Sequence, residues 1–180
     1  MSEELNELQE HAEHAMHDPT LAPISVTMAV LAVLVAVVTL LGHRAHTEEV
    51  VLQAKSSDQW AFYQAKSSRR YASDVAMDTL KAFESAGKGE VAAKLVEKYE
   101  KNAQRYEKEG EEIQTEARKL EAESKLKGKQ ALRMETGEVF LELGIVLASL
   151  AILSKRRPVW FAAMASAGVG AAIALTAAFV

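Results

Sequence analysis

The stretch Ser85-Ala86-Gly87-Lys88-Gly89-Glu90 is the strongest turn signal in the chain, because its two glycines allow backbone conformations that other residues avoid. Proline, which ends or bends helices, occurs only at Pro19, Pro23 and Pro158. Apart from the glycine turn, nothing between the second and third prolines forbids helix. The sequence therefore predicts two very long helices that meet at a tip near residues 87–89.

Two arms of nearly equal length extend from this tip, at residues 43–86 and 90–136. A helix rises about 1.5 Å per residue, so each arm would be about 65 to 70 Å long. Arms that match in length can both be rooted on the same side of one membrane. We therefore expect residues 43–136 to form a long antiparallel helical hairpin that resembles a coiled coil.

The second arm carries a heptad seam, a stripe of positions that lie alternately four and three residues apart. Half of this seam is mostly small, and four of its residues are candidates for close hairpin packing: Ala103, Gly110, Ala117 and Ser124. The first arm has a comparable stripe of small residues with two valines: Val51, Ala54, Ala61, Ala65, Ser68, Ala72, Val75, Ala82 and Ala86. We expect the two stripes to pack against each other. The alternative is that the alanines of the first arm are helix formers on a solvated face.

Three apolar runs flank the arms, one before the hairpin at residues 23–42 and two after it at residues 137–154 and 158–180. A bilayer core of roughly 30 Å takes about 20 mostly apolar residues to cross as a helix. Within the runs, small residues spaced by four, such as Gly144 with Ala148, permit close helix contact in lipid. The sequence thus predicts an all-α membrane protein with three transmembrane helices and the hairpin between the first and second.

Composition narrows the classes of function that the chain can have. Cysteine is absent, which excludes disulfides, thiolate metal sites and a cysteine nucleophile. The net charge is −4 and the arms interleave acidic with basic residues, so the sequence offers no basic face for nucleic acid. The sequence also lacks a nucleophile–base pair, a glycine-rich phosphate loop and a strongly spaced set of metal ligands. We expect neither an enzyme nor a bound cofactor.

Two carboxylates lie at the start of the second apolar run, Glu138 and, one turn later, Glu142. A carboxylate within a membrane is costly unless it is paired, protonated or hydrated. His43, Arg44 and His46 leave the first run on the same side of the membrane. Two interpretations stay open: a structural pairing of one of the carboxylates with this basic group, and a proton or cation pathway through Glu142.

An aromatic run lies in the first arm, on a helix that is otherwise poor in aromatic residues. Its candidates for an interaction patch are Asp58, Gln59, Trp60, Phe62 and Tyr63. Large aromatic side chains serve as packing anchors or as strong contact points for a partner. The run therefore predicts either packing within the hairpin or a docking or subunit interface.

Residues 1–22 form an acidic tail in which His11, His14 and His17 recur at every third position. Neutral imidazoles bind divalent transition metals, so these histidines are weak candidates for a metal site. On a helix, however, these spacings spread the outer two over about 120°, and one ion could not easily bind all three. A solvated acidic tail is the simpler interpretation.

The direction of insertion depends on which basic residues are retained in the cytoplasm. The loop Lys155-Arg156-Arg157 favours one direction, whereas the basic residues where the arms meet the membrane favour the other. The tail of residues 1–22 has no lysine or arginine and would cross a membrane easily. We therefore expect the tail outside and the hairpin in the cytoplasm.

The chain resembles a bacterial family of small membrane proteins classed as a domain of unknown function. The resemblance covers essentially the whole chain and rests on Gly-His-Arg-Ala at residues 42–45, Ser-Asp-Gln-Trp-Ala-Phe-Tyr-Gln-Ala-Lys at residues 57–66, and Lys155-Arg156-Arg157. The family often has proline at its hairpin tip, whereas this tip is Gly87-Lys88-Gly89. The resemblance implies a location in the bacterial inner membrane, and it supplies no activity, substrate or catalytic residue.

Taken together, these features predict a non-enzymatic scaffold or interaction module of the lipid bilayer. A hairpin that buries little apolar surface alone gains stability from neighbours, so we expect it to self-assemble through its helices as a homo-oligomer. The alternative is a small proton or cation transporter or channel component that uses Glu142. The sequence identifies no other protein partner.

Overall fold

The computed structural model describes residues 21–84 and 89–180. Helix α2 spans Ala22–Glu84, α3 spans Gly89–Ser154 and α4 spans Arg157–Thr176, after which a 3-10 turn, η1, covers Ala177–Phe179. The prediction of an all-α chain with three long helices is thereby confirmed. Neither α2 nor α3 is interrupted, which agrees with the absence of proline from both helix interiors.

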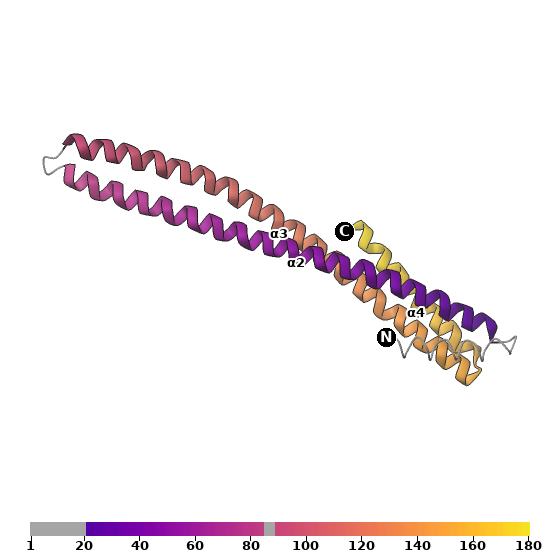
Figure 1. Ribbon diagram of the computed structural model, residues 1–180. Coiled ribbons are helices and arrows are strands. Elements are labelled where there is room, and N and C mark those ends of the chain that lie inside the picture. The colour runs from indigo at the N-terminus through magenta and orange to yellow at the C-terminus, as the bar shows by residue number, and fades with distance from the viewer. Residues whose placement is uncertain (1–20, 85–88) are drawn as a thin grey trace. The chain divides into compact units, whose positions relative to one another are not determined.

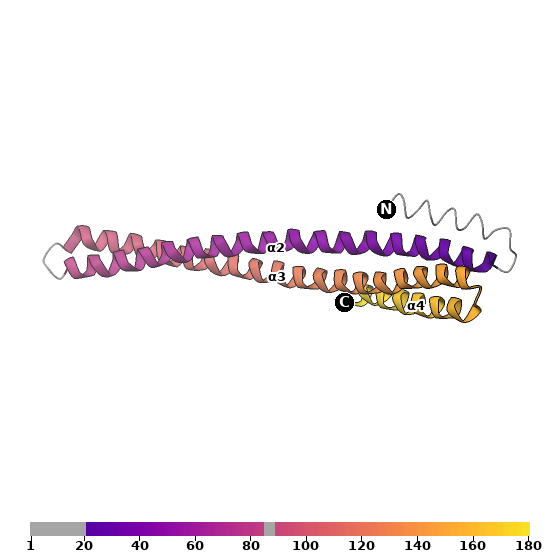
Figure 2. The same cartoon turned by 90° about the horizontal axis from the view of Figure 1, so that it is seen from below.

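The chain divides into two compact units, which are described separately. Residues 49–125 form one, the hairpin unit, and residues up to Glu48 together with those from Leu126 form the other, the apolar bundle. In the hairpin unit α2 and α3 run side by side in opposite directions (Figures 1 and 2). In the apolar bundle α4 turns back and lies along the last turns of α3 (Figures 1 and 2).

The seam of the hairpin unit combines small side chains from α3 with larger or polar ones from α2. The α3 side is buried at Ala92, Ala103, Gly110, Ala117 and Ser124. The α2 side buries two serines and partly buries several longer side chains: Ser56 and Ser73, with Leu52, Gln59, Tyr63, Met77 and Leu80. The narrow α3 surface therefore lets a mixed α2 surface approach closely.

Serine hydroxyls join the two helices across this seam. Ser56 Oγ donates to the carbonyl oxygen of Ala117 at 3.1 Å, and Ser124 Oγ donates to the carbonyl oxygen of Glu49 at 3.1 Å. The first donor belongs to α2 and the second to α3, so each helix donates one hydrogen bond to the backbone of the other helix. A buried hydroxyl is tolerated only when it has such a partner, and these two bonds fix the register of the pair.

The stripe of small residues expected to face the seam from the first arm lies on the outside of α2. Its described members are all exposed: Val51, Ala54, Ala61, Ala65, Ser68, Ala72, Val75 and Ala82. Ala86 lies outside the described residues. The expectation that the two small stripes pack against each other is therefore wrong, because α2 turns a different face to α3.

The apolar bundle packs its three helices around two clusters of buried side chains. One holds Ile24 and Met28 of α2 with three small residues: Ala148, Ala151 and Ala163. The other joins all three helices: Leu31, Val38, Leu141, Ala167 and Ala174. All the small members of the two clusters come from α3 and α4, which lets these two helices approach closely.

The three helices are each long and apolar enough, by length and composition, to cross a membrane. The apolar bundle also exposes many large apolar side chains, among them Val26, Val33, Leu40, Leu143, Leu153, Phe161 and Leu175. Such a surface is rare on a protein surrounded by water. These features are consistent with a multi-pass membrane protein.

Candidate functional site

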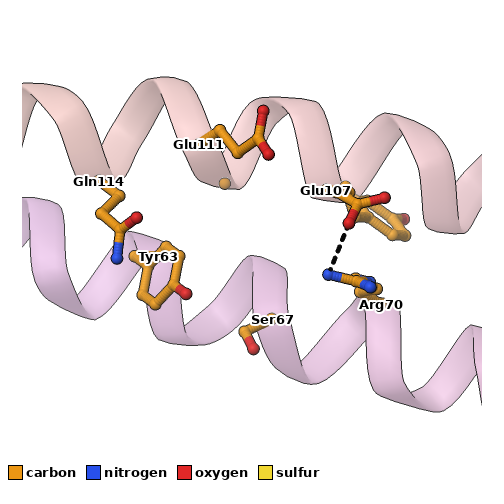
Figure 3. A pocket seen from close by; sticks show the side chains of 8 residues that line it. Tyr63, Ser67, Arg70, Glu107, Glu111 and Gln114 are labelled. Atoms are coloured by element: carbon orange, nitrogen blue, oxygen red, sulfur yellow. Dashed lines mark ion pairs between the residues drawn. The ribbon is translucent and has the colours of Figure 1, made fainter.

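Gly110 in the middle of α3 lies under the ring of Tyr63 and lines a shallow depression in the hairpin unit. The lining residues come from both helices: Tyr63, Ser67, Arg70, Tyr106, Glu107, Gly110, Glu111 and Gln114. Arg70 closes one end through an ion pair with Glu107, with 3.0 Å between Nη1 and Oε1 (Figure 3). An open depression with this polar lining is unlike the enclosed apolar pockets that hold small molecules.

A group of charges surrounds Tyr106 beside this depression. The side chain of Lys66 on α2 forms an ion pair with Glu109 on α3, and its Nζ lies 5.5 Å from the centroid of the Tyr106 ring. The guanidinium of Arg105 lies 5.0 Å from the same centroid and pairs with Glu109 at 3.5 Å. The hydrogen bond from Lys66 lowers the pKa of Glu109, since it favours the ionised carboxylate. The ion pair between Lys66 and Glu109 joins α2 to α3 at a level where the seam buries few apolar side chains.

The aromatic run divides between the two faces of α2. Gln59, Trp60 and Tyr63 are partly buried, and the Trp60 and Tyr63 rings meet edge to face with centroids 5.7 Å apart. Asp58 and Phe62 are exposed, and 59% of the Phe62 surface is accessible. Gln59, Trp60 and Tyr63 thus fit the interpretation of packing within the hairpin. Asp58 and Phe62 fit the interpretation of an interface for a partner.

Asp58 lies within the exposed stripe of small residues on α2, and Phe62 borders it. The stripe positions are 51, 54, 58, 61, 65, 68, 72 and 75, spaced alternately by three and four residues as in a coiled-coil seam. Large exposed side chains lie beside it, including Phe62 and Tyr71, of which 72% is accessible. α2 therefore has two seams, one covered by α3 and one facing outward.

Glu138 and Arg44, two charged residues at the border of the apolar bundle, do not pair with each other and have other partners. The Glu138 carboxylate accepts a hydrogen bond from the Thr39 hydroxyl. Arg44 pairs with Glu48 at 3.3 Å on its own helix, and Lys127 of α3 reaches the same carboxylate at 2.7 Å. The hydrogen bonds from Lys127 and Arg44 lower the pKa of Glu48. Sequence reasoning missed Thr39, since a single threonine in an apolar run has no distinctive pattern.

Glu142 and the histidines of this group lie on the surface. Glu142 is exposed and has no ion pair or hydrogen bond with another described side chain. His43 and His46 are exposed as well. The structure thus places Glu142 on the outside of the apolar bundle, away from its buried clusters.

The histidines proposed as weak metal ligands, His11, His14 and His17, lie outside the described residues. Within residues 21–84 and 89–180, the structure brings together no group of three histidines, cysteines or carboxylates that could hold a metal ion. The remaining candidates for hairpin packing, Ala103, Gly110, Ala117 and Ser124, all lie in the buried seam.

Comparison with known proteins gives one match. The family model described as Domain of unknown function (DUF4337) matches residues 20–180. No curated protein and no solved structure matches the chain. The match begins just before α2 and reaches the last residue, so it includes both the hairpin unit and the apolar bundle.

Proposed function

Since the chain belongs to DUF4337, a family of unknown function, its role has to be argued from its own surfaces, and we propose that it is a membrane scaffold that self-assembles through α2. In this proposal α2, α3 and α4 cross the bacterial inner membrane, and the hairpin unit presents the assembly surface in the cytoplasm. The chain acts by association and carries out no chemical reaction.

The observation that carries the proposal is the outward-facing seam of α2. A seam of small residues with alternating spacing is the pattern of a helix that packs closely against another helix. Its described positions nevertheless face outward, with Phe62 and Tyr71 exposed beside them. Alanine alone would suit a solvated helix, but valines at 51 and 75 and large aromatic neighbours add apolar surface that a partner would cover.

A second copy of the chain is the partner that fits this surface. The outer positions of α3 are crowded with charges, such as Lys98, Lys101, Lys108, Glu112 and Arg118, and offer no apolar stripe to an α2 helix. An equivalent α2 stripe does offer one. Copies inserted in the same direction present their α2 helices in parallel, so each residue of the seam faces its own equivalent.

Asp58 is the one charged position within this seam. In a parallel pair the two Asp58 carboxylates approach each other, which weakens the association. A polar residue at a single seam position is the usual means of selecting register and partner number at a cost in stability. Lys55 flanks the seam one turn away and supplies the opposite charge. The pairing is therefore specific and of limited strength, as suits an assembly that forms reversibly.

Cross-linking tests this arrangement directly, because the chain has no cysteine of its own. The full-length variant Ala65→Cys, in lipid nanodiscs or native membranes, carries one thiol at the centre of the seam. A disulfide needs Cα atoms about 4.4 to 6.8 Å apart, and a tightly packed parallel pair brings equivalent seam positions close to this range. We expect mild oxidation to convert Ala65→Cys and Ala72→Cys into covalent dimers.

The matched control is Gln104→Cys, which places a thiol at an exposed position of α3. It should stay monomeric under the same oxidation. Asp58→Ala should raise the yield of dimer in the Ala65→Cys background, since it removes the like charges from the seam. Equal cross-linking of the α2 and α3 variants, or a monomer by mass in all detergents and nanodiscs, would contradict the proposal.

A further inference from the structure

Three consecutive cations lie where α3 passes into α4, at one end of the apolar bundle. α3 ends at Ser154 and α4 begins at Arg157, so Lys155 and Arg156 alone connect them. Lys155 has a left-handed backbone, with φ 53°, and Arg156 is extended. All three side chains are exposed. We call Lys155, Arg156 and Arg157 the basic loop.

The basic loop has no acidic partner in the part of the chain that the structure describes. None of its three side chains forms an ion pair there, and the sequence from Leu143 to Val180 contains no aspartate or glutamate. α2 has none either before Glu48. Three like charges held within three residues repel one another, and a bound anion would relieve this repulsion.

The surroundings of the basic loop are those of a membrane–water boundary. The indole of Trp160 donates a hydrogen bond to the Thr27 hydroxyl at 3.3 Å and thereby joins α4 to α2 at this end. Tryptophan is enriched at the level of lipid headgroups, where its ring is apolar and its N–H needs a polar partner. Leu153 and Phe161, on either side of the loop, are 74% and 63% exposed. Cations thus lie next to surface that acyl chains would cover.

From these observations we infer that the basic loop binds the phosphate of an anionic phospholipid headgroup. The ligand is a lipid because α3 ends and α4 begins at the loop, and acyl chains would cover the exposed side chains of Leu153 and Phe161 beside it. The headgroup is anionic because three cations without a described counterion face it. Guanidinium groups bind phosphate through paired N–H donors, and no side chain caps the first turn of α4, whose backbone N–H groups add partial positive charge.

The test compares lipids bound to the purified full-length chain by native mass spectrometry in detergent. Phosphatidylglycerol and phosphatidylcholine of identical acyl chains are added in competition. Each cation near an anionic lipid surface contributes about fivefold in affinity, so the three together should favour phosphatidylglycerol by roughly 100-fold. Lys155→Gln with Arg156→Gln and Arg157→Gln should abolish most of this preference. Arg156→Gln alone should reduce it by about fivefold, and it keeps the test valid if the triple variant folds poorly.

The charge-matched control replaces three exposed cations of the hairpin unit: Lys98→Gln, Lys108→Gln and Arg118→Gln. It should keep the full preference for phosphatidylglycerol. Retention of the preference by the triple loop variant would overturn the proposal, because the preference would then come from groups outside the basic loop. Inorganic phosphate that competes as well as the lipid would also overturn it, because a free anion would then be the ligand.

Discussion

The backbones of Gly137 on α3 and Gly170 on α4 touch so closely that a Cβ atom added to Gly137 would lie 2.7 Å from the carbonyl oxygen of Gly170. In the reverse direction, a Cβ atom on Gly170 would lie 2.6 Å from the carbonyl oxygen of Gly137. Real Cβ atoms do not approach backbone oxygens to this extent. Among the glycines of the described residues, these two leave the least room for a Cβ atom, so any larger residue at either position must push α3 and α4 apart.

Alanine at Gly137 or Gly170 should therefore destabilise the apolar bundle. A methyl group at either position pushes the two backbones apart, and overpacking of this kind costs about 1 to 3 kcal/mol. Gly168→Ala is the matched control, because an added Cβ would meet no atom within 4 Å. Thermal unfolding in detergent, followed by circular dichroism, should show a lower Tm for the first two variants and an unchanged or higher Tm for Gly168→Ala. Equal Tm values for all three would refute the close contact.

Gly110 in the hairpin unit should respond to substitution according to size. A Cβ atom there would lie 3.7 Å from the Tyr63 ring, an ordinary contact, so Gly110→Ala fits without movement. It should raise stability by about 1 kcal/mol, the helix-propensity difference between glycine and alanine. Gly110→Leu, in contrast, must displace the Tyr63 ring and should lower stability. Denaturant unfolding of the full chain measures both, and a stabilising leucine would show that the position is open to solvent.

Acid should loosen the hairpin unit near Glu109. Its pKa is lowered in the folded chain, chiefly by the hydrogen bond from Lys66, so its stabilising contribution is present above the unfolded pKa of about 4.3. That contribution is lost as the pH falls through the lower folded pKa. The protection factors of amides around Glu109, which are exchange rates corrected for their intrinsic dependence on pH, should therefore fall more on acidification from pH 6 to pH 3 in the native chain than in Glu109→Gln. Glu112→Gln, at an exposed position without an ion pair among the described residues, should keep the native response.

Removal of the Thr39 hydroxyl should destabilise the apolar bundle. It donates to Glu138, and Thr39→Val leaves this half-buried carboxylate without that partner, at a cost of about 1 to 3 kcal/mol. Thr47→Val is the matched control, since Thr47 is exposed and bonds only the His43 carbonyl oxygen among described groups. Glu142→Gln should leave Tm unchanged, because Glu142 is exposed and forms no ion pair or hydrogen bond with another described side chain. A larger loss in Tm with Thr47→Val than with Thr39→Val would contradict this assignment.

Much of the fold can be predicted from the sequence, because long helices leave clear signals. Prolines outside the helix interiors, apolar runs of membrane length and one glycine turn are enough to predict three helices and their order. The α3 side of the seam can be predicted equally well, since Ala103, Gly110 and Ala117 recur every seven residues. These signals are local, and each follows from the period of a helix and the size of a side chain.

The α2 side of the seam could not be predicted in the same way. Ser56, Gln59 and Lys66 face α3, yet polar residues do not register in a search for apolar periodicity. Ser56 can be buried because its hydroxyl donates to the Ala117 carbonyl, and Lys66 can be partly buried because it pairs with Glu109. The alanine stripe on the opposite face has the stronger periodic pattern, so the sequence predicts the wrong face for the seam. Which of two possible faces packs depends on partners that only the tertiary structure supplies.

Small side chains in the hairpin seam also determine how stability responds to temperature. Unfolding of alanine, glycine and serine contacts exposes little apolar surface, and it is apolar exposure that raises the heat capacity. The hairpin unit should accordingly have a heat-capacity change below the usual value of about 12 to 15 cal/mol/K per residue. Its stability curve is then broad and shallow, so that cooling removes little of the driving force for folding. A hairpin joined by hydroxyls and ion pairs should therefore keep a similar stability over a wide range of temperature.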